Sequence, residues 1–249
     1  MTRPDHAVFS PPRLPDGQRA AVRWSVAMVG AVGAVALVWL SVEAAATALA
    51  TAAVGASLML HAFRQSGLGR FAPCNRVTLA RLGVAALLTG LLALGAVPDG
   101  LAWTALALAL AALLLDGIDG WLARRGHDSS AFGARFDMEV DAALIAILAM
   151  LAWSLGKAGP WVLALGMMRY AFVAAAWVWP WLGAPLPHSH RRRVTCGVQV
   201  VVLAALLAPI LTPPLSVWLA AGALLTLTAS FAVDVLWLWR HRPLARPVA

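Results

Sequence analysis

Long apolar blocks, separated by short stretches that hold charged residues, proline or glycine, run through most of the chain. Each block is about twenty residues long, and a helix of that length, rising about 1.5 Å per residue, crosses the ~30 Å hydrocarbon core of a bilayer. The core of a soluble domain does not need such segments. The pattern predicts an all-α, polytopic transmembrane helix bundle with eight helices, over residues 23–41, 42–63, 77–97, 101–123, 137–155, 160–182, 194–211 and 215–239.

The composition agrees with a membrane protein. Hydrophobic residues make up 61% of the chain and charged residues 12%, whereas soluble domains are about half apolar and about a quarter charged. The net charge of +8 comes from short basic clusters at the ends of apolar blocks, so we expect no nucleic-acid partner. Cys74 and Cys196 have no metal-ligand spacing, which argues against a zinc site or a disulfide framework.

The arginines predict the orientation in the membrane, because cytoplasmic loops accumulate basic residues. If the eight helices alternate in direction, the arginines before the first helix and after every second helix all fall on one face. Lys157 is the one basic residue of the opposite loops. We therefore expect an inner-membrane protein with both termini cytoplasmic, including an N-terminal segment over residues 1–22 and a tail over residues 241–249. No cleaved signal peptide is expected.

Acidic residues are rare and clustered. Six of the eleven Asp and Glu residues fall between residues 116 and 141, where one apolar block ends and the next begins. Asp116 and Asp119 are three residues apart, and Asp137 and Asp141 are four apart, so each pair faces one side of its own predicted helix. Four such carboxylates repel one another unless a cation neutralises them. An all-oxygen ligand set favours Mg²⁺ or Mn²⁺, and four acids suit two ions better than one.

The same segment carries glycine, alanine and arginine at fixed spacing. It reads Asp-x-x-Asp-Gly-x-x-Ala-Arg over residues 116–124 and, after eight residues, Gly-x-x-x-Asp-x-x-x-Asp over residues 133–141. All eight specified positions match the pattern of the CDP-alcohol phosphatidyltransferase family, which this chain therefore resembles. Chance agreement is on the order of 10⁻¹⁰ per starting position at ordinary residue usage. Asn75, Thr78 and Arg81 also resemble the residues that open the core of that family.

The resemblance implies a six-helix catalytic core over residues 73–240, preceded by two additional helices over residues 23–63. Members of the family transfer a phosphatidyl or related group from a CDP-linked lipid such as CDP-diacylglycerol to an alcohol and release CMP. They use divalent metals at the cytoplasmic face of the membrane and form homodimers. The resemblance implies that Asp141 is the general base, and that the metal ligands are Asp116, Asp119, Asp137 and Asp141. It implies contacts with the CDP group for Asn75, Thr78, Arg81, Gly120, Ala123, Arg124 and Gly133.

Further arginines suggest that the acceptor alcohol carries a phosphate. Arg169 lies near the middle of the sixth predicted helix, where a charge is costly unless it faces a cavity. A guanidinium binds phosphate through two N–H groups at once. Glycerol 3-phosphate is our preferred acceptor. Because the motif reports only on the CDP half, inositol phosphate, serine, phosphatidylglycerol or an unusual alcohol stay open, and the run at residues 191–193 also suits a topology anchor. The hypothesis gives acceptor binding to Arg135, Arg169, Arg191, Arg192 and Arg193.

Three alternative functions stay open at the level of sequence. An intramembrane Mg²⁺-dependent prenyltransferase also holds a diphosphate with acids, but it carries two separated Asp-rich motifs, whereas this chain has one. A transporter would place acids or broken helices near the midplane of several spans. A non-catalytic scaffold relative would not need all four acids, and this chain has retained them.

Overall fold

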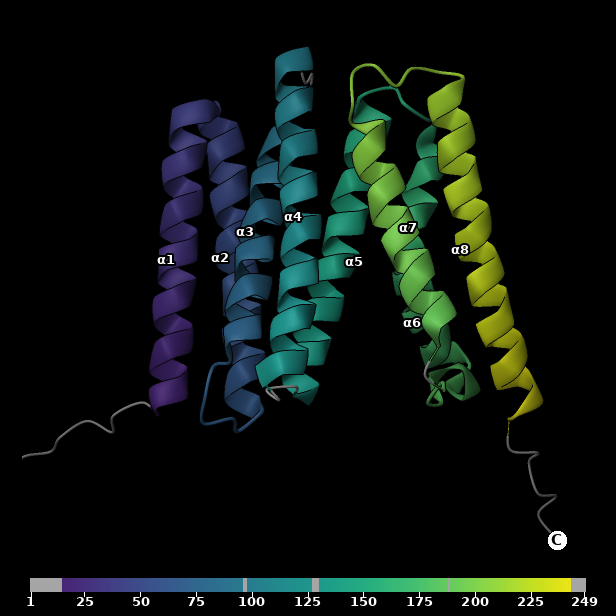
Figure 1. Cartoon of the computed structure of the whole chain (residues 1–249), viewed down its shortest axis with the longest axis horizontal. Coiled ribbons are helices and arrows are strands. Elements are labelled where there is room, and N and C mark those ends of the chain that lie inside the picture. The colour runs from purple at the N-terminus through teal and green to yellow at the C-terminus, as the bar shows by residue number, and fades with distance from the viewer. Residues whose placement is uncertain (1–14, 96–97, 127–129, 188, 243–249) are drawn as a thin grey trace, which may run out of the picture.

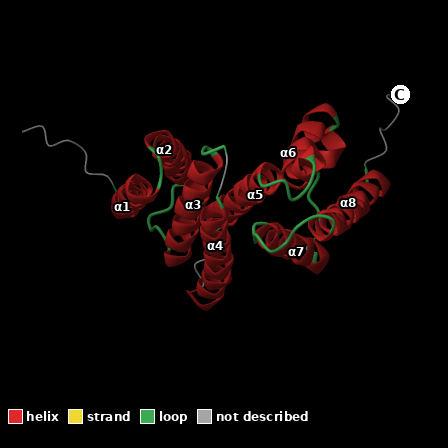
Figure 2. Ribbon diagram, turned by 90° about the horizontal axis from the view of Figure 1, so that it is seen from above, coloured by secondary structure: helices red, strands yellow, loops and turns green. Residues whose placement is uncertain are grey.

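The computed structural model of the protein describes residues 15–95, 98–126, 130–187 and 189–242, without the side chains of residues 123, 124 and 126. Within these ranges every regular element is helical, so the all-α prediction is confirmed (Figures 1 and 2). Two short 3₁₀ helices, η1 (Pro160–Val162) and η2 (Pro180–Gly183), flank α6. The α-helices are α1 (Asp16–Trp39), α2 (Val42–Gln65), α3 (Pro73–Leu92), α4 (Asp99–Gly126), α5 (Ala131–Ser154), α6 (Leu163–Val178), α7 (His190–Leu206) and α8 (Leu215–Arg240).

Successive helices run in opposite directions, so that alternate connections lie at the same end of the bundle (Figure 1). In the described part of the chain, six segments are long and apolar enough to cross a membrane: α1, α2, α3, most of α4, η1 with α6, and α8. The protein is therefore a multi-pass membrane protein. Two of the eight predicted spans do not qualify by themselves: α7 has 17 residues, and every 18-residue stretch of α5 contains three acids.

Several helices begin earlier than the apolar blocks do. The α5 helix starts at Ala131 instead of residue 137, because the Ser130 hydroxyl accepts a hydrogen bond from the backbone N–H of Gly133 at 3.0 Å and caps the first turn. The α1, α3 and α7 helices likewise start at Asp16, Pro73 and His190. Hydropathy marks only the part of a helix that lies in hydrocarbon, so it misses these polar first turns.

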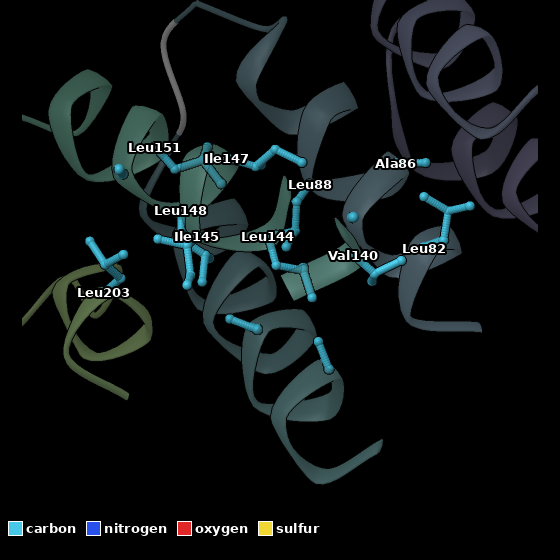
Figure 3. Packing of buried hydrophobic residues seen from close by; sticks show 14 of the residues in the cluster. Leu82, Ala86, Leu88, Val140, Leu144, Ile145, Ile147, Leu148, Leu151 and Leu203 are labelled. Carbon is cyan, nitrogen blue, oxygen red and sulfur yellow. The ribbon is translucent and has the colours of Figure 1, made fainter. Parts of the chain in front are cut away.

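The α5 helix is central to the packing. It lies between α3 on one side and α6 and α7 on the other (Figure 2). Figure 3 shows the apolar cluster in which side chains of α5 meet those of α3 and α7. A Cβ on Gly166 of α6 would lie 2.5 Å from Cα of Ala146, so glycine allows α5 and α6 to approach closely. This packing fixes α5, which carries half of the acidic cluster.

The α1–α2 hairpin packs against α3 as part of the same bundle (Figure 2). A Cβ on Gly90 of α3 would lie 2.9 Å from the carbonyl oxygen of Ala44, so these backbones are also in close contact. At the other end of α3, the guanidinium of Arg76 lies over the Trp24 ring, 5.2 Å from its centroid. The two additional helices thus support the helix that carries Asn75, Thr78 and Arg81.

Lys157 is buried in the connection between α5 and η1. This connection lies at the end of the bundle opposite to the arginine-rich connections (Figure 1). The Lys157 ammonium donates hydrogen bonds to the backbone carbonyls of Ala208, Pro209 and Leu211, at 3.0, 3.4 and 2.7 Å. The Ser216 hydroxyl donates in turn to the Lys157 carbonyl at 2.6 Å. Lys157 therefore binds the backbone that follows α7 and helps to hold this end of the bundle together. This role explains why one basic residue departs from the distribution of the arginines.

Candidate active site

Four carboxylates from α4 and α5 surround one guanidinium from α3. The Nη1 atom of Arg81 lies 3.0 Å from Asp116 Oδ1, 3.1 Å from Asp119 Oδ2 and 2.6 Å from Asp137 Oδ1. The Nη2 atom donates a hydrogen bond to Asp141. The helical spacing of the acids thus places all four on the faces where α3, α4 and α5 meet.

The charges of this cluster do not balance. Only 3% of the Arg81 side chain is exposed, and it supplies one positive charge to four carboxylates. Like charges this close favour the binding of further cations. Oxygens of Asp116, Asp119 and Asp137 lie within 4.8 Å of one another, an arrangement that fits one ion. Carboxylate oxygens are the ligands that Mg²⁺ and Mn²⁺ prefer, so the residues present fit such a cation.

A cavity of about 490 Å³ opens over the cluster. We call it the carboxylate cavity, and its walls come from α3, α4, α5 and α7. Its volume lies in the range of sites for small molecules and cofactors. The charged residues, glycines and cysteine that line it are Arg81, Asp116, Gly117, Asp119, Gly120, Asp137, Asp141, Arg193, Cys196 and Gly197.

Three more residues predicted to contact CDP have described surroundings, and one of them, Thr78, contacts the cluster. The Thr78 hydroxyl is within hydrogen-bond distance of Asp119 Oδ2 (3.3 Å). Asn75 is buried, and its Nδ2 has no hydrogen-bond partner among the described residues. A Cβ on Gly133 would lie 2.8 Å from Asn75 Oδ1, so the missing side chain at Gly133 makes room for Asn75.

The remaining predicted CDP contacts differ in what the structure shows. Gly120 lines the carboxylate cavity. Ala123 and Arg124 belong to α4, but their side chains lie outside the described part of the structure. Arg81 lies among the carboxylates and lines the same cavity. Nothing in the sequence specified which residues of other helices Arg81 would meet.

A second cavity of about 280 Å³ lies among α5, α6, α7 and α8. We call it the arginine cavity, because Arg169 and Arg192 line it. Asp141 and Cys196 line both cavities, so the two spaces adjoin at these residues. The arginine cavity is otherwise mostly apolar, with residues such as Ile145 in its wall.

The arginines of this region already contact other groups. Arg169 forms an ion pair with Glu139. Arg191 pairs with Asp234 and also donates to the Ser230 hydroxyl at 2.8 Å. Arg192 donates to the carbonyl of Pro187, and its Nη1 lies 3.8 Å from Asp234. These contacts leave other guanidinium N–H groups available, since each arginine carries five.

The five predicted acceptor contacts are not brought together in one place. Arg169 and Arg192 line the arginine cavity, and Arg191 lies at its margin through its contacts with Ser230 and Asp234. Arg193 lines the carboxylate cavity instead. Arg135 lines a third hollow of about 830 Å³ between α2 and α5. The set is thus divided among three regions of the molecule.

The sequence reasoning assigned no role to three buried polar residues at the arginine cavity, Gln199, Ser230 and Asp234. An acid in a membrane helix needs a partner, so Asp234 could have been matched with the arginines at residues 191–193. Gln199 carries no charge and belongs to no motif, so no signal in the sequence pointed to it.

The comparisons with known proteins agree with the motif. The model of the CDP-alcohol phosphatidyltransferase family matches residues 71–233, well over half of the chain. The resemblance found in the sequence is therefore confirmed. The matched segment contains all four acids of the cluster and leaves α1 and α2 outside it. No curated protein and no solved structure matches the chain.

Proposed function

Because the chain belongs to the CDP-alcohol phosphatidyltransferase family, we propose that it transfers a phosphatidyl group from CDP-diacylglycerol, or a similar CDP-linked lipid, to a small alcohol and releases CMP. The observation that carries the proposal is the group of four carboxylates around Arg81 at the floor of a cavity. The alternative functions fit less well, because the described acids of the cluster come from one pair of neighbouring helices. A prenyltransferase would carry two separated acidic motifs, and a transporter would place acids in several spans.

The carboxylate cavity is the proposed site of the CDP diphosphate. Asp116, Asp119 and Asp137, together with Asp141, would hold Mg²⁺ or Mn²⁺, and two ions would suit the four acids. When bound, such ions neutralise the diphosphate and stabilise the charge that develops during an in-line displacement. Arg81 fixes the relative positions of the four carboxylates and adds a positive charge beside the diphosphate.

Asp141 is the proposed general base. Its carboxylate accepts the proton of the acceptor hydroxyl as the hydroxyl oxygen forms a bond to the phosphorus of the phosphatidyl group. The bond between that phosphorus and the bridging oxygen breaks, and CMP leaves with the electron pair. The support for this role is that Asp141 lines both cavities, so it can face a donor on one side and an acceptor on the other.

The arginine cavity is the proposed acceptor site. Its volume of about 280 Å³ is at the lower limit for ligand pockets, so it favours a small alcohol over a second lipid. Arg169 and Arg192 would bind a phosphate of the acceptor, as in glycerol 3-phosphate. Arg191 would hold Asp234 in place at the margin of this cavity. Arg193, which lines the carboxylate cavity, would contact the donor. Arg135, which lines a separate hollow, receives no role in substrate binding.

We extend the proposal to location and assembly. The distribution of arginines favours an inner-membrane protein whose active site faces the cytoplasm. An active site at the cytoplasmic face of the membrane would let the acyl chains of the donor stay in lipid while its head group enters the cavity. Membership of the family also favours a homodimer.

The test is CMP release by the purified protein in detergent, with CDP-diacylglycerol, Mg²⁺ or Mn²⁺, and a panel of alcohols. The variant Asp141→Asn removes the proposed base, and Asp99→Asn, at the start of α4 and outside both cavities, is its matched control. We expect CMP release that depends on the acceptor, is abolished by Asp141→Asn and is retained by Asp99→Asn. Folded, metal-binding protein that releases no CMP with any acceptor would favour the scaffold alternative.

A further inference from the structure

Gln199 is a buried amide without a partner. It lies in the second half of α7, only 3% of the residue is exposed, and it lines the arginine cavity. Its Nε2 has no hydrogen-bond partner among the described residues. A glutamine amide carries two N–H donors, and a buried donor left unpaired is a substantial cost to the folded protein. The arrangement therefore calls for an oxygen atom that the described side chains do not supply.

The surroundings of Gln199 argue against a purely structural role. A polar residue that holds two membrane helices together donates its hydrogen bond to the neighbouring helix, and the Gln199 amide does not. Leu165 and Leu227 in the wall of the cavity have no polar atoms in their side chains. The acids of the cavity are already engaged, since Asp141 accepts from Arg81 and Asp234 accepts from Arg191. The hydroxyls of Thr195 and Ser230 also line the cavity, but neither is a hydrogen-bond partner of the amide. A bound molecule can therefore supply the acceptor oxygen.

The polar groups of the arginine cavity have a definite order along α7. Arg192, Cys196 and Gln199 follow one another at spacings of four and three residues, so they share one face of the helix and all line this cavity. Cys196 also lines the carboxylate cavity, as Asp141 does. The place where the cavities adjoin therefore lies between an arginine on one side and the Gln199 amide, about one helical turn away, on the other.

We propose that the Gln199 amide donates a hydrogen bond to a second oxygen of the acceptor, beside the hydroxyl that reacts. This inference rests on the proposed function and deepens it. An acceptor with its reacting hydroxyl at Asp141 presents its phosphate to the arginines and its second hydroxyl to Gln199. The residue thus selects a phosphorylated polyol over a phosphorylated alcohol that has no second hydroxyl.

The experiment compares two acceptors that differ in that one group. The value of kcat/KM is measured with CDP-diacylglycerol and either glycerol 3-phosphate or 3-hydroxypropyl phosphate, which has the same three-carbon chain but lacks the second hydroxyl. We expect the wild-type protein to prefer glycerol 3-phosphate by at least about tenfold. In Gln199→Leu the preference falls to about one, through a higher KM for glycerol 3-phosphate and little change for the other acceptor. The control is Val201→Leu, an exposed position of the same helix.

The possible results separate this inference from the proposed function. If Gln199→Leu retains the wild-type preference, the inference is wrong and the transferase proposal stands. If the variant loses activity equally with both acceptors and melts at a lower temperature, Gln199 serves packing, and the inference is again wrong. If the wild-type protein releases CMP with neither compound, the proposed class of acceptor is wrong, and the role of Gln199 is overturned with it.

Discussion

Nη1 of Arg81 lies 2.6 Å from Oδ1 of Asp137, a contact that joins α3 to the first half of α5. The same nitrogen lies 3.0 Å from Asp116 and 3.1 Å from Asp119, both on α4. One guanidinium therefore links three helices and sets the spacing of the carboxylates. A planar group with five N–H donors can make these contacts together, and a lysine ammonium is a single charged point.

Replacement of Arg81 by methionine is expected to affect both stability and activity. The variant leaves carboxylates in the cluster without their cation, which should lower the free energy of unfolding by about 3 kcal/mol and CMP release by at least about a hundredfold. Thermal unfolding in detergent and CMP assays measure the two effects. Arg64→Met, at an exposed arginine of α2, is the control. Equal melting temperatures for the two variants would show that the Arg81 contacts contribute nothing to stability.

Asp119→Asn is expected to weaken binding of Mn²⁺ by at least about tenfold, because it removes one of the three converging carboxylates. The amount of free Mn²⁺, followed by electron paramagnetic resonance during titration of the purified protein, gives the affinity. Asp99→Asn removes the same charge at the far end of α4 and should leave binding unchanged. Identical titrations for both variants would place the ion away from the cluster.

Gly133→Ala is expected to reduce CMP release by about tenfold or more, since small displacements of catalytic groups have effects of this size. The new Cβ would lie 2.8 Å from Oδ1 of the buried Asn75, so either the Asn75 side chain or α5, which carries Asp137 one turn further along, must shift. Gly222→Ala, where an added Cβ meets no atom within 4 Å, should be tolerated. If both glycine variants retain full activity, the contact between Gly133 and Asn75 does not position the site.

Lys157→Met is expected to lower the free energy of unfolding by about 1–3 kcal/mol, because it leaves buried carbonyl groups after α7 without their hydrogen-bond donor. Lys157 lies at the opposite end of the bundle from the acidic cluster, so the activity of the folded fraction should stay near that of the wild-type protein. Thermal unfolding and the CMP assay, performed on the same preparation, separate the two quantities. A melting temperature equal to that of the wild-type protein would contradict the packing role.

Much of the fold could be predicted from sequence because membrane helices leave a strong apolar signal. All eight helices were predicted, and their alternation followed from the arginines. Their starts were placed too late where the first turn is polar, as at Ser130, whose hydroxyl caps α5. Helix caps and tertiary contacts decide these boundaries, and hydropathy is insensitive to both.

The positions of the acids in the candidate site could be predicted from sequence, but their partners could not. Spacing alone put Asp116 and Asp119 on one face and Asp137 and Asp141 on another. The position of Arg81 between them depends on how α3 packs against α4 and α5, which no local pattern encodes. The pairing of Arg169 with Glu139 is of the same kind, because the partners are 30 residues apart in the chain and meet only in the folded bundle.

The packing of α1 and α2 on α3 has a consequence for biogenesis. Of the six segments that could cross a membrane, α3 is the least apolar and the most buried, and it carries Asn75 and Arg81 within the protein interior. Such a helix is poorly soluble in lipid by itself. The α1–α2 hairpin is synthesised first, so a protein surface is already in the bilayer when α3 leaves the translocon, before the acids that pair with Arg81 have been made.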